Sequence, residues 1–506
     1  MRAPAPTLPI AARPVMANAM AEVARIVSRE LLLAAGTCPV IRTDGGGVAF
    51  DVSGSRGAAL ANEISAQLNT AALIHHRDTD SVTASVERFA NRYLDQPTGA
   101  AADEVGADDL TDPRSLANQP PVVRYVNLLI REALAAGASD IHLDGTSDGL
   151  DVRLRIDGVL TPGPPAIDGL QSAILSRWKL LADLDIAERR RPQDGRIRTR
   201  VGDANVDLRL STVPSLHGES AVIRVLDRTN GAVGLDELGI PPNILRQLRA
   251  LIRRPHGLLL VTGPTGSGKT TTLYSALAER ANGREKLISV EDPIEIQVEG
   301  VTQVPLHKEV GVSFASALRA LLRHDPDVLM IGELRDAETA GVAVQASMTG
   351  HLVLATLHTN DSVSAISRLV DLDVPRFLIA DTLAGVLAQR LVRRLCTECA
   401  APATNTAAIV TAAREVLPAS EPLLARPAAQ RAVGCSACRG TGYRGRVGVF
   451  EFMPFTHESR DLILSLSAQG GAKVNAYTVE PLIADGMRKV LAGISSLDEV
   501  QHAIAV

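Results

Sequence analysis

The chain has 506 residues, of which 46% are hydrophobic and 22% are charged. At roughly 150 residues per domain, this length predicts about three domains, and the composition excludes a wholly disordered or collagen-like chain. The formal net charge of −5 is too small to indicate nucleic acid or an anionic membrane as a partner.

The first 95 residues are rich in alanine and contain no chemical motif. Residues 17–33 and 81–94 have a helical pattern. Neither this part nor the rest of the chain holds an apolar run of the length of a signal peptide or a membrane-spanning helix, which points to the cytoplasm. Residues 96–119 combine proline, glycine, alanine and aspartate with little apolar content, and they are predicted to be a flexible linker.

Residues 120–230 are predicted to form a small α+β domain. Apolar residues first recur at helical spacing over residues 122–136. Short alternating stretches typical of strands follow at Asp140–Leu143, Leu150–Ile156 and Val206–Leu210. Gly158 and Gly195 mark turns between such stretches.

Residues 235–506 change to short, nearly continuous apolar runs, each followed by a loop and a helix. The runs are Leu258–Val261, Leu287–Val290, Val328–Ile331 and Leu352–Ala355. Runs of this kind suit buried, mostly parallel strands, so this part is predicted to be an α/β domain. Within it, residues 391–446 are predicted to be an insertion that holds two cysteine pairs, and residues 447–506 are predicted to be mainly helical.

A phosphate-binding loop is predicted directly after the first of these runs. Residues 263–270, with the sequence GPTGSGKT, fit the pattern G-x-x-x-x-G-K-[ST], and a helical run follows. The glycines let backbone N–H groups turn toward phosphate oxygens, and the helix N-terminus adds positive potential. Lys269 supplies a charge for the β- and γ-phosphates, and the Thr270 hydroxyl is a ligand for Mg²⁺. An ordinary glycine-rich turn is the alternative, but the chain has only six lysines, so a chance match is rare.

Acidic residues and histidines accompany the next three runs. Glu333 follows the run 328–331 as in a Walker-B motif, and Glu291 and Asp292 follow the run 287–290. His351 and His358 bracket the last run, so one or both could touch a γ-phosphate or its water. Taken singly, these residues could be helix caps or core histidines. Because ligands bind at the carboxyl edge of parallel sheets, we expect them near the phosphates.

The five cysteines comprise one single residue, Cys38, and two C-x-x-C pairs much further along the chain. In a reducing compartment this pattern favours a metal site over disulfides. Cys38 stands alone and is predicted to have no function.

Together these motifs resemble the traffic ATPases of type II secretion and type IV pilus assembly, with the general secretory pathway E proteins as the nearest group. The resemblance covers about residues 120–506. It rests on ASDIHLD (138–144), VRLRIDGVL (152–160), RPQDGRI (191–197), VDLRLSTVPSLHGES (206–220), ISVEDPIE (288–295), RHDPDVLMIGELRDAETA (323–340), TGHLVLATLHTND (349–361) and DGMRKVLAGISSLDEV (485–500).

The resemblance implies a homohexamer with a RecA-like P-loop ATPase core, a preceding small α+β (PAS-like) domain, a tetracysteine zinc insertion and a helical C-terminal region. The middle domains would rotate against the motor domains as ATP turns over. Residues 1–95 would dock onto the cytoplasmic domain of a bitopic inner-membrane protein, and a polytopic platform protein would be a further partner. The protein would then lie peripherally on the cytoplasmic face of the inner membrane.

The resemblance also implies roles for single residues. Lys269, Glu333 and Glu291 are implied to be catalytic, and Arg196 and Arg209 of the middle domain are implied to reach the nucleotide. The residues implied to bind the nucleotide are Gly263, Pro264, Thr265, Gly266, Ser267, Gly268, Lys269, Thr270, Thr271, Asp292, His351 and His358, with Thr270 also binding magnesium. Arg319, Arg323, Arg335 and Arg368 match basic positions of the motor domain.

An arginine near a γ-phosphate can neutralise the charge on its equatorial oxygens during cleavage. For Arg196 and Arg209, a surface ion pair is the alternative. The family supplies the same kind of interpretation for Cys396, Cys399, Cys435 and Cys438, whose four thiolates can surround Zn²⁺ in a closed, structural site. Free thiols or two redox pairs are the alternatives.

Several functions remain possible at this stage. An ATPase that powers type II secretion leads, and a type IV pilus assembly ATPase shares nearly all of its motifs. A nucleic-acid translocase of RecA-like fold is disfavoured, because only 3% of residues are aromatic and the net charge is negative. A non-catalytic, nucleotide-gated scaffold is disfavoured by the presence of both Lys269 and Glu333.

Overall fold

The structure is a computed structural model of the whole chain. The residues that it describes are 32, 37–41, 48–54, 58–62, 73–76, 78–89, 113–201, 204–227, 232–306, 311–465 and 479–504. They fall into two compact units, residues 1–107 and residues 108–506. The predicted helix at 17–33 lies outside the described residues except for Leu32, and so does most of the predicted linker. The end of that predicted linker, Pro113–Ala117, is helix α5.

The described part of the first unit contains a small sheet. Strand β1 (Thr37–Ile41) pairs antiparallel with β2 (Val48–Val52), and β2 pairs parallel with β3 (Leu73–His76). Helix α4 (Thr79–Phe89) packs against β1 and β2. No strand was predicted here, because β1 is only five residues long and contains Pro39, which sheets accept on an edge strand such as this one.

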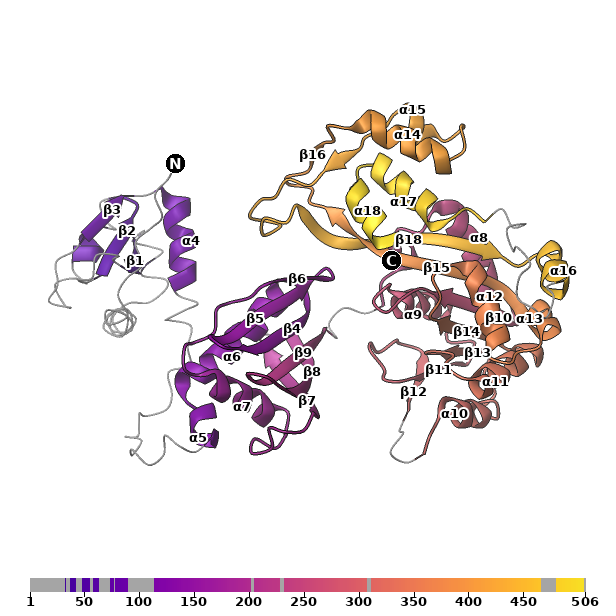
Figure 1. Ribbon diagram of the computed structural model, residues 1–506, viewed down its shortest axis with the longest axis horizontal. Helices are drawn as coiled ribbons and strands as arrows, with labels where there is room; N and C mark the ends of the chain where they lie inside the picture. Colours follow the sequence, from indigo (N-terminus) through magenta and orange to yellow (C-terminus); the bar gives the residue numbers. More distant parts are fainter. Residues whose placement is uncertain are drawn as a thin grey trace. The chain divides into compact units, whose positions relative to one another are not determined.

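The middle domain is an antiparallel sheet with helices on one face (Figure 1). After α5 its elements are α6 (Pro120–Ala135), β4 (Ala138–Thr146), β5 (Gly149–Ile156), β6 (Val159–Pro162), α7 (Gln171–Leu181), β7 (Gln193–Val201), β8 (Ala204–Ser215) and β9 (Gly218–Asp227). The strand order is β6-β5-β4-β9-β8-β7. Apolar side chains such as Ile141, Leu208 and Ile223 face α6 and α7. Trp178 on α7 is fully buried in this core.

The α/β domain predicted from residue 235 onward is built on a seven-stranded sheet in the order β12-β11-β13-β14-β10-β15-β18. Its strands are β10 (Gly257–Thr262), β11 (Leu287–Glu291), β12 (Val301–Pro305), β13 (Val328–Ile331), β14 (Leu352–Leu357), β15 (Leu383–Leu395) and β18 (Tyr443–Pro454). All are parallel except β18, which pairs antiparallel with β15. The four apolar runs therefore form buried parallel strands, as predicted.

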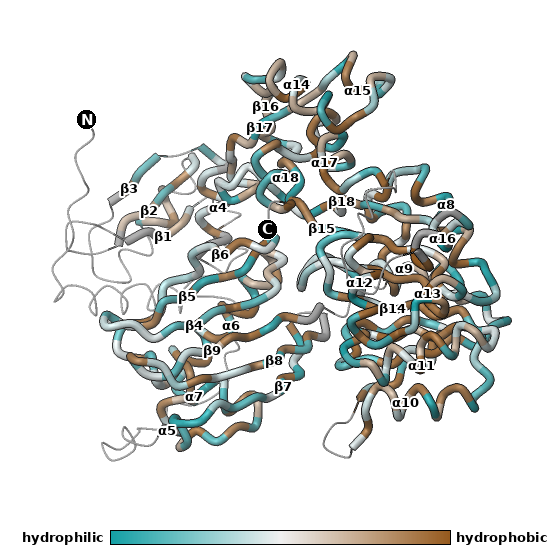
Figure 2. The backbone as a smooth tube through the Cα atoms, turned by 45° about the vertical axis from the view of Figure 1, so that its right-hand side comes forward, coloured by the Kyte–Doolittle hydropathy of each residue, from teal (hydrophilic) through white to brown (hydrophobic). Residues whose placement is uncertain are grey.

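Helices cover both faces of this sheet, because its strands are apolar on both sides. The helices are α8 (Pro242–Ile252), α9 (Lys269–Arg280), α10 (Phe314–Leu321), α11 (Ala337–Met348), α12 (Ser362–Asp371) and α13 (Arg376–Thr382), preceded by the 3₁₀ turn η4 (Leu235–Leu238). Helices α10 to α13 pack with alternate strand residues on one face, and α8 and α9 pack with the others. Figure 2 shows hydrophobic, brown stretches inside this domain around β14.

Acidic residues of the recognised motifs cap two of these helices. Asp336 accepts a hydrogen bond from the Thr339 N–H at the start of α11. Asp361 does the same for the Ser364 N–H at the start of α12. A helix cap is thus the structural role of these two acids. Glu333, by contrast, lies in the loop between β13 and α11.

The C-terminal part differs from the prediction at its beginning. Residues 447–454, predicted to be helical, continue β18, because the nearly continuous apolar run over 447–453 is buried against β15. The other elements are β16 (Ala401–Pro402), α14 (Thr406–Val416), α15 (Pro422–Ala425), β17 (Gln430–Arg431), α16 (His457–Ser465), α17 (Leu482–Leu491) and α18 (Leu497–Ile504). None of the helices among the described residues has the length and apolar character needed to cross a membrane.

Candidate nucleotide site

The predicted phosphate loop lies between the carboxyl end of β10 and the start of α9. Gly263 and Gly268 have φ angles of 148° and 87°, which L-residues with a Cβ rarely adopt. Thr265 and Gly266 are exposed at the tip of the loop. The loop thus combines exposed residues with a helix N-terminus, which is the arrangement that binds phosphate.

Lys269 is held against its own loop. Its Nζ donates to the carbonyl oxygens of Gly263 (2.8 Å) and Pro264 (2.9 Å). Burial lowers the pKa of Lys269 to about 8, while the charge of Glu333 opposes this shift. The ammonium group is therefore positioned within the loop and interacts electrostatically with the Walker-B acid.

Glu333 lies between a histidine and an arginine side chain. One carboxylate oxygen is 3.1 Å from His358 Nε2, and the other accepts a hydrogen bond of 2.5 Å from Arg335 Nε. The Glu333 side chain is 21% exposed. Burial lowers the pKa of His358, and the charge of Lys269 lowers it further, while Glu333 opposes both. The structure thus brings together Lys269, Glu333 and His358 from three different strand ends.

His351 lies at the other edge of the sheet. It precedes β14, whose first residue pairs with Gly257 at the beginning of β10, whereas the phosphate loop follows Thr262 at the end of β10. The ring Nδ1 of His351 is 2.9 Å from the carbonyl oxygen of Ala346. The expectation that His351 contacts the phosphate of its own subunit is therefore wrong. Only the residue that follows a parallel strand reaches the carboxyl edge.

Glu291, at the end of β11, is enclosed by polar groups. Its carboxylate accepts hydrogen bonds from Ser289 Oγ (2.5 Å), Gln303 Nε2 (3.0 Å) and the Tyr274 hydroxyl. The residue is 2% exposed. The next residue, Asp292, is half-buried. The catalytic role of Glu291 stays a prediction. Its hydrogen bond with Tyr274 links α9 to β11.

Of the other basic positions predicted in this domain, one contacts the cluster directly and the others have different partners or positions. Arg335 contacts Glu333, as described above. Arg319 pairs with Glu338 at 2.7 Å, and Arg323 donates to the carbonyl oxygen of Arg319. Arg368 lies in the last turn of α12.

Three arginines form a row across the middle-domain sheet. Arg196 on β7 is directly opposite Arg209 on β8, and Arg209 is opposite Arg224 on β9. Like charges in opposed positions destabilise a sheet. The three side chains line a surface hollow of about 440 Å³, together with acidic residues that include Asp140. Such a row is typical of a site for an anion, because an anion offsets the repulsion.

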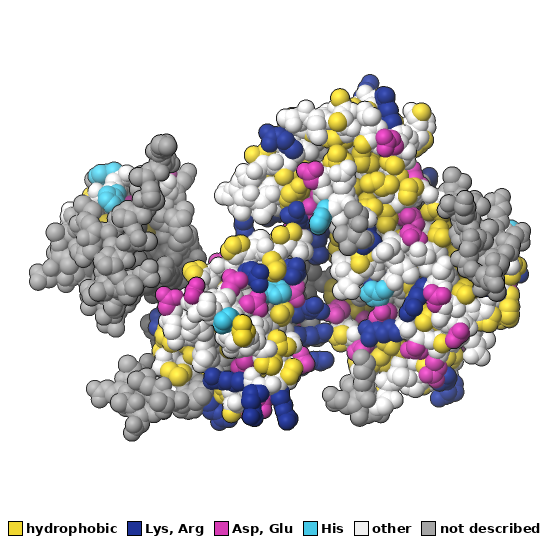
Figure 3. All heavy atoms as spheres, viewed as in Figure 1, with side chains coloured by type: hydrophobic (Ala, Val, Ile, Leu, Met, Phe, Trp, Pro, Cys, Tyr) yellow, Lys and Arg dark blue, Asp and Glu magenta, His cyan; other side chains and the backbone are white. Residues whose placement is uncertain are grey.

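No site role was predicted for Arg224. Its place in the alternating stretch before Leu226 nevertheless puts it on the same face of the sheet as Arg196 and Arg209. Its Nε is 3.2 Å from Asp140 Oδ1. Arg209 Nη1 lies 3.8 Å from Glu295 Oε1 of the α/β domain. Figure 3 shows dark-blue basic side chains gathered on the part of the middle domain that holds β7 and β8.

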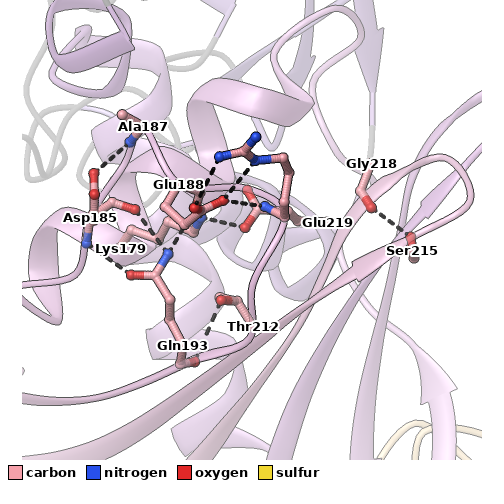
Figure 4. Close-up of polar contacts among 10 residues, drawn as sticks. Lys179, Asp185, Ala187, Glu188, Gln193, Thr212, Ser215, Gly218 and Glu219 are labelled. Carbon is pink, nitrogen blue, oxygen red and sulfur yellow. Dashed lines mark hydrogen bonds and ion pairs between the residues drawn. The ribbon is translucent and has the colours of Figure 1, made fainter.

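A buried polar cluster holds the loop that leads into β7 (Figure 4). Lys179, only 1% exposed, forms an ion pair with Glu219 and donates to the carbonyl oxygen of Glu188 at 2.8 Å. The Gln193 side-chain amide donates to the carbonyl oxygens of Asp185 (3.0 Å) and Glu188 (2.9 Å). These bonds fix the start of β7, and with it the first arginine of the row.

The four paired cysteines come together as predicted. Their Sγ atoms all lie within 4.8 Å of one another. The contacts of 3.9 Å between Cys396 and Cys435 and of 3.8 Å between Cys399 and Cys438 are far longer than a disulfide bond. Four thiols at this spacing fit a tetrahedral metal ion.

Backbone N–H groups point at the sulfur atoms. Those of Cys435 and Gly442 each lie 3.1 Å from Cys438 Sγ. Burial raises the pKa of Cys438. The two N–H groups and hydrogen bonds from the neighbouring cysteine side chains lower it by more, so the pKa is about 6. At Cys438 these bonds therefore favour the thiolate, which is the form that binds zinc, whereas burial raises the pKa of Cys399 to about 11.

A family model described as "Type II/IV secretion system protein" matches residues 115–502. The type II secretion system protein HxcR of Pseudomonas aeruginosa is 44% identical over 428 residues, which cover 81% of this chain and 86% of the relative. The type II secretion system ATPase E of Vibrio cholerae is 43% identical over 419 residues, which cover 81% of this chain and 82% of the relative.

Two solved structures have a similar fold. The pilus retraction motor PilT with bound ADP is 28% identical, with a TM-score of 0.50 and coverage of 74% of this chain and 96% of the other. The ATPase DotB of Yersinia pseudotuberculosis is 20% identical, with a TM-score of 0.56 and coverage of 77% and 95%. Both alignments extend over most of the described second unit.

Proposed function

Because the chain belongs to the type II/IV secretion system protein family, we propose that it hydrolyses ATP to power protein export through a type II secretion system. It acts as a homohexamer on the cytoplasmic face of the inner membrane. The observation that carries the proposal is the meeting of Lys269, Glu333 and His358 at the phosphate loop. The similar relatives named for type II secretion favour this machine over a pilus.

The chemistry follows from what these side chains can do. Lys269 exchanges the carbonyl oxygens of its own loop for the β- and γ-phosphate oxygens of ATP. The Thr270 hydroxyl would hold Mg²⁺, which would neutralise phosphate charge. Glu333, oriented by Arg335 and His358, takes the proton of the attacking water. The products are ADP and phosphate.

The arginine row supports a coupling of hydrolysis to motion. Arg196 and Arg209 stabilise charge on the phosphates when the middle domain approaches a nucleotide. Because these side chains belong to a separate domain, the loss of the γ-phosphate changes what holds that domain in place. We propose that this change passes as mechanical strain to an inner-membrane platform, which comprises the cytoplasmic domain of a bitopic protein and a polytopic protein.

Lys269→Ala tests the hydrolysis itself. The variant should bind and hydrolyse ATP at least about a hundredfold less well, because a phosphate-binding charge is lost. Lys286→Ala is the matched control, since Lys286 directly precedes β11 at the opposite edge of the sheet and donates to Thr302. Phosphate release measured on the hexamer gives the answer. Wild-type turnover in the Lys269 variant would contradict the proposal.

Arg209→Ala tests the middle-domain contribution. Turnover should fall about tenfold while the melting temperature stays near that of wild type, because the residue is opposed by like charges. Arg198→Ala is the control, since Arg198 lies on the neighbouring strand β7, opposite Asp207 rather than an arginine. Equal turnover in both variants would refute a role for the row.

Cys435→Ser tests the zinc site. The variant should hold less zinc per chain and unfold at a lower temperature, while magnesium–ADP still binds. Cys38→Ser, in the separate N-terminal unit, is the control for zinc content. A wild-type zinc content in the Cys435 variant would reject the four-cysteine site.

A further inference from the structure

The phosphate loop packs against a strand that no recognised motif includes. Strand β15 lies beside β10 in parallel, with Thr262 paired to Ala388, so the next residue of β15 lies beside the beginning of the loop. That residue is Gln389, which is 2% exposed. A buried amide needs hydrogen-bond partners, and the partners of Gln389 identify what it holds.

Both ends of the Gln389 amide bond to the phosphate-binding segment. Nε2 donates to the carbonyl oxygen of Ser267 at 2.7 Å. Oε1 accepts from the Thr272 hydroxyl at 2.8 Å. Ser267 belongs to the loop, and Thr272 to the first turn of α9, so one side chain links the loop to the helix that it precedes. The amide supplies both the donor and the acceptor that these two partners require.

The same residue also explains two glycines of the loop. A Cβ at position 263 would come within 2.4 Å of the Gln389 carbonyl oxygen, and a Cβ at position 268 would lie 3.1 Å from Gln389 Nε2. Gln389 therefore packs on the loop as well as bonding to it. The next residue, Arg390, donates to Asn360 Oδ1 at 3.1 Å, just beyond His358. Consecutive residues of β15 thus contact both loops that meet at the phosphates.

We propose that Gln389 is a positioning residue for ATP binding, which holds the Ser267 peptide so that the loop N–H groups face the phosphates. The proposal rests on ATP being the ligand of this loop. A merely structural amide would contribute to folding alone. The two roles differ in one respect: positioning requires the donor at Nε2, because that atom is the one bonded to the loop.

The first experiment compares Gln389→Met with Thr382→Val in the full-length hexamer. Met has a similar shape but no polar end. Thr382, in the last turn of α13 before β15, donates to the carbonyl oxygen of Leu378, so Thr382→Val removes a buried bond of the same kind away from the loop. Calorimetry with magnesium–ADP and thermal unfolding are measured on each. We expect about tenfold weaker binding for Gln389→Met and wild-type binding for Thr382→Val.

The second experiment uses Gln389→Glu, which is isosteric with the native residue. Its carboxylate has no donor and repels both the Ser267 carbonyl oxygen and the phosphates, so binding at pH 8 should be weaker than in Gln389→Met. Once protonated, the acid regains a donor. The ratio of its Kd to the wild-type Kd should therefore fall several-fold between pH 8 and pH 6, whereas the ratio for Gln389→Met stays constant.

Three outcomes decide the matter. Wild-type affinity in Gln389→Met overturns the proposal. If that variant does not fold, the Gln389→Glu profile decides instead, and a ratio that does not change with pH overturns it. Failure of the wild-type protein to bind magnesium–ADP would refute the proposed function itself. That result differs from one in which the wild-type protein binds and both Gln389 variants bind equally well, which would refute only the role of Gln389.

Discussion

The ends of the neighbouring strands β11 and β13 carry the same chemical group in opposite surroundings. Glu291 is 2% exposed, and its carboxylate accepts hydrogen bonds from three uncharged side chains. Glu333 is more exposed, and its carboxylate lies between His358 and Arg335. Both were expected to be catalytic, because both follow a buried parallel strand in a recognised motif.

The difference teaches that the partners of a strand-end acid decide its role. A carboxylate whose oxygens are used by core hydroxyl and amide groups stabilises the packing of elements, here α9 on β11. A carboxylate that faces a histidine and the phosphate-loop lysine can take up a proton. We expect substitutions at the two positions to separate these roles.

The largest effect is expected for Glu333→Gln. The amide keeps the shape of the side chain but cannot take the proton of the attacking water, so phosphate release should fall at least about a hundredfold. Magnesium–ATP should bind within a few-fold of wild type, as measured by calorimetry. Turnover within tenfold of wild type would contradict the proposed catalytic role of Glu333.

Glu291→Gln should act mainly on folding. The amide can no longer accept at both ends, so the free energy of unfolding should fall by about 2 kcal/mol, measured by denaturant titration. The folded variant should still bind magnesium–ATP. A loss of turnover as large as that of Glu333→Gln, without a loss of stability, would break the comparison and make Glu291 catalytic as the motif predicts.

The pH dependence of ATP binding should report Lys269. Its pKa of about 8 in the free protein is below the ordinary value of 10.5 because the side chain is buried. Bound phosphate favours the charged form, so the Kd for magnesium–ATP should rise by up to about tenfold per pH unit above 8. Lys269→Ala should show no such rise. A wild-type Kd that is constant up to pH 9 would contradict the assignment.

The same shift has the opposite sign for stability. Between about pH 8 and pH 10.5 the unfolded chain binds more protons at Lys269 than the folded chain. This residue therefore adds stability to the nucleotide-free protein as the pH rises through that window, while ATP affinity falls. Comparison of wild type with Lys269→Ala isolates both trends.

The smallest effect is expected for Tyr274→Phe. The Tyr274 hydroxyl donates to Glu291, and a hydrogen bond to a carboxylate is stronger than one to a carbonyl. The variant should lose about 1.5 kcal/mol of unfolding free energy. Tyr125→Phe, which loses a bond to the carbonyl oxygen of Pro164, should lose less. An equal loss in both would mean that Glu291 does not act as a charged acceptor.

The sequence predicted those parts of the protein that consecutive residues build. The phosphate loop, the buried parallel strands and the two cysteine pairs are contiguous or nearly so, and each has a local geometry that few other sequences adopt. The prediction of His351 as a phosphate contact failed, although strand direction alone separates it from His358: one precedes β14 and the other follows it.

Contacts between distant residues could not be predicted in this way. Gln389 and Ser267 are separated by 122 positions, and Arg224 and Asp140 by 84. The Tyr274–Glu291 bond depends on how α9 packs on the sheet, and β18 is a strand only because β15 offers it an edge to pair with.

The amino-acid sequence by itself thus determined where along the chain the phosphate loop and the cysteine pairs form, because both are short-range structures built by nearly consecutive residues. Only the tertiary structure decided which charged groups lie beside the phosphate loop and which are buried in the core. The physical reason is that burial and hydrogen-bond partners arise from the packing of whole elements.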